Sequence, residues 1–211
     1  MISLAAAAER LRASVVVVRA GADGRAGGGA GIAWRAGGVV VTSAHVVDAR
    51  DVTVVLPDGG AVPGEVVRRD PRRDLALVLA PRAALPPVRH ADPARLRPGS
   101  LLFAVGHPLG VVDAVTTGVL QATGPLPPGL GVPGMPGDLA WLQADLRLAP
   151  GNSGGPVADA EGRVVGVSAM VVAGLGLAVP APDVEAFVAG EAPPRSASGR
   201  TPRRGRRPAY I

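Results

Sequence analysis

Residues 151–156 of this 211-residue chain read GNSGGP, which is the sharpest local signal in the sequence. A serine between glycines lets main-chain amides converge beside its hydroxyl, and a site that stabilises an oxyanion needs that arrangement. The chain is rich in glycine, so an ordinary Gly-Ser turn is the alternative interpretation. The choice depends on whether the sequence also supplies catalytic partners for Ser153.

A serine hydroxyl is a weak nucleophile at neutral pH, so it needs an imidazole that accepts its proton and a carboxylate that orients the imidazole. The chain has three histidines. His45 comes just after the apolar run VVVT at 39–42, which would hold it rigidly. His90 lies in a proline-bearing stretch and His107 in a GHPLG turn, and both are interpreted as solvated loop residues. We therefore predict His45 as the base.

The carboxylate is sought in the segment RRDPRRDLALVLA, residues 68–80. Asp74 leads directly into the apolar run LALVLA, which would anchor it inside the fold. Asp70 precedes a proline and lies between two pairs of arginines, so we interpret it as a solvated turn residue. The predicted triad is therefore His45, Asp74 and Ser153.

Short β-like runs bounded by glycine, proline or aspartate follow one another along the chain. The candidate strands are 14–19, 30–35, 38–42, 52–56, 61–68 and 74–80, and then 100–105, 112–122, 139–144, 155–158, 163–170 and 175–179. Two groups of six strands without βαβ spacing predict an all-β fold of two antiparallel six-stranded barrels. Short helices are expected at 2–12 and 182–189. An active site would then lie in the cleft between the barrels.

This pattern divides the chain into three parts. Residues 1–95 are predicted to form the N-terminal barrel with His45 and Asp74, and residues 96–190 the C-terminal barrel with Ser153. Residues 191–211 are predicted to be a disordered Arg-rich tail. The proline- and glycine-rich segment 124–137 is expected to be a long surface loop.

Composition excludes several classes of protein. The chain has no cysteine, which rules out disulfide scaffolds, cysteine nucleophiles and iron-sulfur ligation. All 22 basic residues are arginine, and six of them follow Glu191, so the net charge of +5 resides in the tail. Nucleic-acid binding is therefore not expected of the globular part, and binding through the tail is kept as a hypothesis.

Three motifs in the order TSAHVV (42–47), DLALV (74–78) and GNSGGPV (151–157) resemble the trypsin-like serine proteases of the HtrA/Deg type. The resemblance covers about residues 12–188 and extends to AVGHPLG (104–110) and GRVVGVSAM (162–170). It implies a chymotrypsin-like fold of two Greek-key barrels. The implied activity is a serine endopeptidase that hydrolyses unfolded or misfolded polypeptides through an acyl-enzyme, with no metal or organic cofactor. No C-terminal PDZ domain is recognised in the sequence.

The resemblance also implies roles for individual residues. Gly151, Asn152 and Ser153 would form the oxyanion hole, with the amides of Gly151 and Ser153 as the donors. Ser168, Ala169 and Met170 would offer the strand edge that pairs with substrate backbone.

Arg147 stands six positions before Ser153, where an inward side chain would favour acidic residues at P1, the substrate residue before the scissile bond. The favoured interpretation is that Arg147 points to solvent or pairs with Asp145, because an unpaired buried guanidinium is costly. The resemblance otherwise suggests small or medium aliphatic P1 residues.

Two further expectations remain open. The first residues carry Glu9, Arg10 and Arg12 where an export signal would be apolar, and no apolar run is long enough to span a membrane. Cytoplasmic location is therefore slightly favoured, although the family habit is extracytoplasmic. The second hypothesis for function is a catalytically silent or chaperone-like binding module of the same fold. The sequence does not indicate an oligomeric state.

Overall fold

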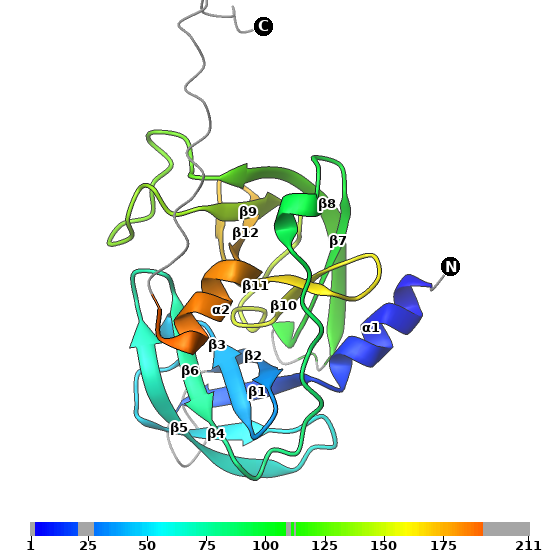
Figure 1. Cartoon of the computed structure of the whole chain (residues 1–211), viewed down its shortest axis with the longest axis vertical. Coiled ribbons are helices and arrows are strands. Elements are labelled where there is room, and N and C mark those ends of the chain that lie inside the picture. Colours follow the sequence, from blue (N-terminus) through cyan, green and yellow to red (C-terminus); the bar gives the residue numbers. More distant parts are fainter. Residues whose placement is uncertain (1–2, 21–27, 109–110, 112, 192–211) are drawn as a thin grey trace, which may run out of the picture.

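A computed structural model describes residues 3–20, 28–108, 111 and 113–191 of the chain. Twelve strands form two closed antiparallel barrels of six strands each, and two short helices flank them. In Figure 1 the first barrel, blue to cyan, lies below the second, green to orange. The predicted all-β double-barrel fold is thus confirmed. The predicted tail, apart from Glu191, lies outside the described residues.

The first barrel has the strand order β1-β2-β3-β6-β5-β4. Its strands are β1 (Val15–Ala20), β2 (Gly28–Arg35), β3 (Val39–Thr42), β4 (Asp51–Val55), β5 (Ala61–Asp70) and β6 (Leu75–Leu79). The inward positions are mostly valine, because a β-branched side chain packs well inside a narrow barrel. β3 pairs with β6 and not with β4, so the ends of β3 and β5, where His45 and Asp74 follow, lie at one rim.

The second barrel has the order β10-β11-β12-β9-β8-β7. Its strands are β7 (Leu101–Gly106), β8 (Ala114–Gly124), β9 (Trp141–Ala144), β10 (Pro156–Asp159), β11 (Val164–Val172) and β12 (Leu175–Pro180). A β-bulge in β11 between Ser168 and Met170 turns Ala169 out of the regular ladder. The loop of residues 151–155, which contains the predicted nucleophile Ser153 and is called the nucleophile loop below, enters β10 beside this bulge.

The helices and the linker join the two barrels. Helix α1 (Leu4–Arg12) lies against β7, and helix α2 (Ala181–Ala189) lies against β11, β12 and β6. The linker contains the 3-10 turn η2 (Pro93–Arg95) and forms a parallel bridge from His90 to Val164. One hydrophobic cluster contains residues of both barrels and both helices. The division of the chain at residue 95 remains a prediction, since the linker contacts both barrels.

The predicted surface loop 124–137 is irregular beyond Gly124, but its Leu126 and Met135 pack against the core. No helix in the described part of the chain is long and apolar enough to cross a membrane.

Candidate active site

His45 lies on the 3-10 turn η1 (Ala44–Val46), directly after β3. The turn is held in place on the side of the first barrel, because the Thr42 hydroxyl just before it donates to the Ala30 carbonyl at 2.7 Å and Ala44 is buried. The imidazole projects into the space between the barrels, and its side chain is 51% exposed. His45 is therefore rigidly held yet accessible to a substrate.

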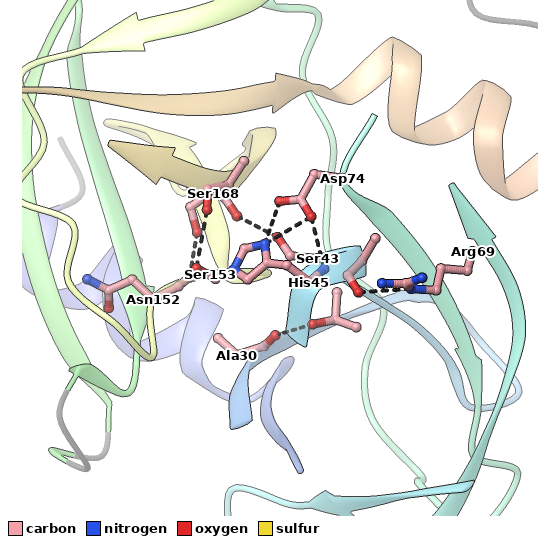
Figure 2. Close-up of polar contacts among 11 residues, drawn as sticks. Ala30, Ser43, His45, Arg69, Asp74, Asn152, Ser153 and Ser168 are labelled. Atoms are coloured by element: carbon pink, nitrogen blue, oxygen red, sulfur yellow. Dashed lines mark hydrogen bonds and ion pairs between the residues drawn. The ribbon is translucent and has the colours of Figure 1, made fainter. Parts of the chain in front are cut away.

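Asp74 lies in the turn between β5 and β6, and only 2% of its surface is exposed. Its φ is 55°, a left-handed conformation that Asp adopts more readily than most residues. One carboxylate oxygen accepts from the His45 backbone N–H at 3.0 Å, and both oxygens lie 2.9 Å from His45 Nδ1 (Figure 2). The carboxylate thus fixes both the backbone and the ring of His45.

This pairing sets the protonation of the imidazole. The hydrogen bond to Asp74 raises the pKa of His45 above its ordinary 6.5, while partial burial lowers it by less and the negative charge of Asp74 adds to the rise. With the Nδ1 proton held by the carboxylate, Nε2 of the neutral ring is left as an acceptor. The ring can therefore act as a general base.

Ser153 lies on a tight loop that the glycines make possible. Gly154 has a φ of 84°, and its Cα is so close to the first barrel that an added Cβ would lie 2.3 Å from the Ala30 carbonyl oxygen. The Ser153 carbonyl in turn accepts from the Ala30 amide at 2.9 Å. The Ser153 hydroxyl donates to the Ala169 carbonyl at 3.2 Å, and among the described residues no hydrogen bond joins it to His45.

The backbone amides of Gly151, Asn152 and Ser153, which are expected to bind an oxyanion, differ in whether they already donate a hydrogen bond within the protein. Asn152 N–H donates to the Ala149 carbonyl at 2.9 Å, so it is already used. No acceptor within the described ranges receives a hydrogen bond from the amides of Gly151 or Ser153. The Gly151 carbonyl accepts from His107 N–H at 3.2 Å, which fixes the orientation of that peptide group.

His107 and Ser168 surround the nucleophile loop and do not line the cleft. His107 follows β7 and is buried, so its interpretation as a solvated loop residue was wrong; burial lowers the pKa of its imidazole. Ser168 is also buried, and its carbonyl accepts from Gly154 N–H at 2.8 Å. Its hydroxyl contacts the carbonyls of Asn152 and Gly155. Ser168 N–H donates to the Gly155 carbonyl at 2.9 Å, so both backbone groups of Ser168 are used within the protein and hold the loop in place.

A cleft of about 660 Å³ lies between the barrels. Its lining residues are Ala44, His45, Arg69, Pro71, Asp74, Met135, Leu148, Ala149, Pro150, Ser153, Ala169, Met170 and Val171. The predicted contacts Ala169 and Met170 line it. Arg147 does not: it is exposed, and none of the described carboxylates lies within ion-pair distance of it.

Sequence reasoning missed Arg69 and Met135 as cleft residues, because each reaches the site from a distant segment. Asp70, interpreted as a solvated turn residue, is instead the last residue of β5 and is partly buried, and its carboxylate accepts from Arg73 at 2.7 Å. The residues that the structure describes include no cluster of three side chains suited to hold a metal ion.

Two closed barrels with a histidine, an aspartate and a serine at their junction define the class of double-barrel serine proteases. The model of the trypsin-like peptidase domain matches residues 29–167. The chain belongs to this family, and specifically to its HtrA type, as the relatives described next indicate.

The chain is 39% identical over 158 residues to a serine protease homologue named HhoB of Synechocystis, covering 73% of this chain and 38% of that protein. It is 34% identical over 167 residues to the mitochondrial serine protease HTRA2 of Drosophila pseudoobscura pseudoobscura, covering 77% and 39%. The HtrA-type protease AlgW with a decapeptide matches with a TM-score of 0.75 at 25% identity, covering 89% of this chain and 68% of AlgW.

The chain spans less than half the length of the curated relatives it matches. Other relatives, from Marinomonas and Pseudomonas putida, are named as periplasmic DegP-like endoproteases. The slight preference for a cytoplasmic location therefore finds no support.

Proposed function

We propose that the chain is a serine endopeptidase domain in which His45, Asp74 and Ser153 act as the catalytic triad. The observation that carries the proposal is the buried Asp74 carboxylate, which lies 2.9 Å from His45 Nδ1 and leaves Nε2 directed to the cleft that Ser153 also lines. The unused amides of Gly151 and Ser153 support an oxyanion hole next to the same hydroxyl.

The proposed reaction begins when the Ser153 hydroxyl leaves the Ala169 carbonyl and turns to His45. Its oxygen attacks the substrate carbonyl carbon while His45 Nε2 takes the proton, and Asp74 stabilises the imidazolium that forms. The amides of Gly151 and Ser153 bind the oxyanion. His45 then protonates the leaving amine, the peptide bond breaks, and water hydrolyses the acyl-enzyme by the same steps.

Unfolded or misfolded polypeptides are the proposed substrates. A cleft open to solvent between two barrels admits an extended chain, which would pair with the strand edge at Ala169 and Met170. The walls beside Ser153 are apolar, formed by Leu148, Pro150 and Met170, which supports small or medium aliphatic P1 residues.

One observation favours a second candidate, a catalytically silent binding module. The Ser153 hydroxyl donates its hydrogen bond to the Ala169 carbonyl, and the described residues include no hydrogen bond from it to His45. Catalytic hydrogen bonds are often long or misaligned before substrate binds, which is why the endopeptidase stays the first proposal.

The test is cleavage of casein at neutral pH by the wild type and by Ser153→Ala at equal concentration, together with labelling by a fluorophosphonate. Endopeptidase activity predicts that the wild type alone cleaves casein and alone is labelled. If neither protein cleaves casein and the wild type is not labelled, the binding module becomes the first proposal.

A further inference from the structure

Arg69, at the end of β5, brings a positive charge into the catalytic cleft. Its Nε donates to the Ala44 carbonyl at 3.0 Å, next to His45 in the chain (Figure 2). This single bond fixes the plane of the guanidinium and leaves both terminal nitrogens as donors. Within the described part of the chain, no carboxylate or carbonyl accepts from those two nitrogens.

No neighbouring carboxylate in the described residues forms an ion pair with Arg69. The nearest carboxylates in the chain are engaged elsewhere, Asp70 by Arg73 and Asp74 by His45. Arg68 bonds the last carbonyls of α2, at Phe187 and Val188, and does not line the cleft. This wall of the cleft therefore presents a guanidinium whose two terminal nitrogens bind no carboxylate in the described residues, while the Asp74 carboxylate is buried and hydrogen-bonded to His45.

Strand geometry tells which substrate side chain would meet this charge. Successive side chains of an extended peptide point to opposite sides. If the P1 side chain enters the apolar wall beside Leu148 and Pro150 of the second barrel, the P2 side chain points to the first barrel. There it would lie over His45, against Pro71 and Arg69.

We propose that Arg69 is a specificity-determining residue that makes the enzyme prefer an acidic side chain at P2. The proposal rests on the endopeptidase function and triad proposed above. A planar guanidinium with two free terminal nitrogens matches the two oxygens of a carboxylate. Arg69 is exposed, so the preference should be modest and sensitive to salt.

The test uses internally quenched peptides that are identical except for Glu, Gln or Lys at P2, with Val fixed at P1. The expected ratio of kcat/KM for Glu over Gln is about twofold to tenfold at low salt, with Lys lowest. The ratio should fall toward one in Arg69→Gln and in 1 M salt, and part of it should return in Arg69→Lys.

Arg72→Gln is the matched control. It also removes one arginine charge, three positions along the chain from Arg69, but the Arg72 side chain does not line the cleft. It should keep the wild-type ratio. The rate of Ser153 labelling by fluorophosphonate, measured for each variant, reports whether the loss of the bond to Ala44 has disturbed His45.

The outcomes separate the specificity role of Arg69 from the endopeptidase function. An equal loss on all three peptides in Arg69→Gln makes Arg69 a structural support of Ala44 and overturns the specificity role. The specificity role is also overturned if the wild type cleaves the peptides but does not prefer Glu at P2, or prefers an acidic side chain at another position. A wild type that cleaves no peptide and resists labelling overturns the endopeptidase function itself.

Discussion

Replacing Gly154 by alanine should destabilise the contact at which the nucleophile loop meets the first barrel. The added Cβ would lie 2.3 Å from both the Ala30 carbonyl oxygen and the Thr42 hydroxyl, well inside the 3.0 Å that Cβ contacts essentially never cross. Those two atoms are hydrogen-bonded to each other, so the methyl group must separate them. The change therefore combines overpacking with the loss of a buried hydrogen bond.

Gly37→Ala provides the reference. Gly37 has a φ of 82°, almost the same as the 84° of Gly154, but nothing lies within 4 Å of its added Cβ. Both variants incur the left-handed backbone cost of about 1–2 kcal/mol, partly offset by the lower entropy of the unfolded chain. Overpacking adds about 1–3 kcal/mol and the hydrogen bond about 1 kcal/mol only at Gly154. We expect Gly154→Ala to lower the free energy of unfolding by about 2–4 kcal/mol more than Gly37→Ala.

The measurement is equilibrium unfolding in urea, with both variants built on Ser153→Ala so that self-digestion cannot occur. Equal m-values would show that the two variants unfold from equally compact states. A difference between them below about 0.5 kcal/mol would refute the steric reasoning, because it would mean that the loop moves away from Ala30 at almost no cost.

Three more outcomes are expected. Asp74→Asn should lower kcat on the order of 10³–10⁴-fold in peptide hydrolysis, because the His45 tautomer is no longer fixed. The acid limb of kcat/KM should have its midpoint above pH 6.5, since neutral His45 is the active form and the Asp74 hydrogen bond raises its pKa. The pKa of His107 is lowered in the folded protein, so as pH falls His107 is protonated in the unfolded chain before it is protonated in the folded one. Unfolding free energy should then fall as pH drops below about 6.5, and His107→Asn should weaken that fall in urea titrations at several pH values.

The barrels were predictable because their signals are local. Apolar runs at strand length, separated by glycine, proline and aspartate, predicted all twelve strands to within a few residues. His45 and Asp74 were singled out because each adjoins a buried strand, and the structure brings their side chains together. Their catalytic role remains a proposal.

Side-chain direction was harder, because it depends on contacts far along the chain. Arg147 was considered for the pocket from its distance to Ser153, yet Leu148 N–H donates to the Leu146 carbonyl at 2.9 Å, so Arg147 is the central residue of a tight turn and its side chain is exposed. The Arg69 side chain is held at the cleft by the hydrogen bond from its Nε to the Ala44 carbonyl of η1. That partner lies 25 residues earlier in the chain, and no local pattern predicts it.

The bond from the Ala30 amide to the Ser153 carbonyl has a consequence for the order of events during synthesis. If His45, Asp74 and Ser153 form the proposed triad, the first barrel leaves the ribosome with the histidine and the aspartate but without the serine. The nucleophile loop packs against Ala30 and Thr42 of the first barrel and is hydrogen-bonded to Ser168, and Ser168 is synthesised after the loop itself. With the proposed triad, proteolytic competence would require the second barrel as well, so an incomplete chain could not cleave itself or its neighbours.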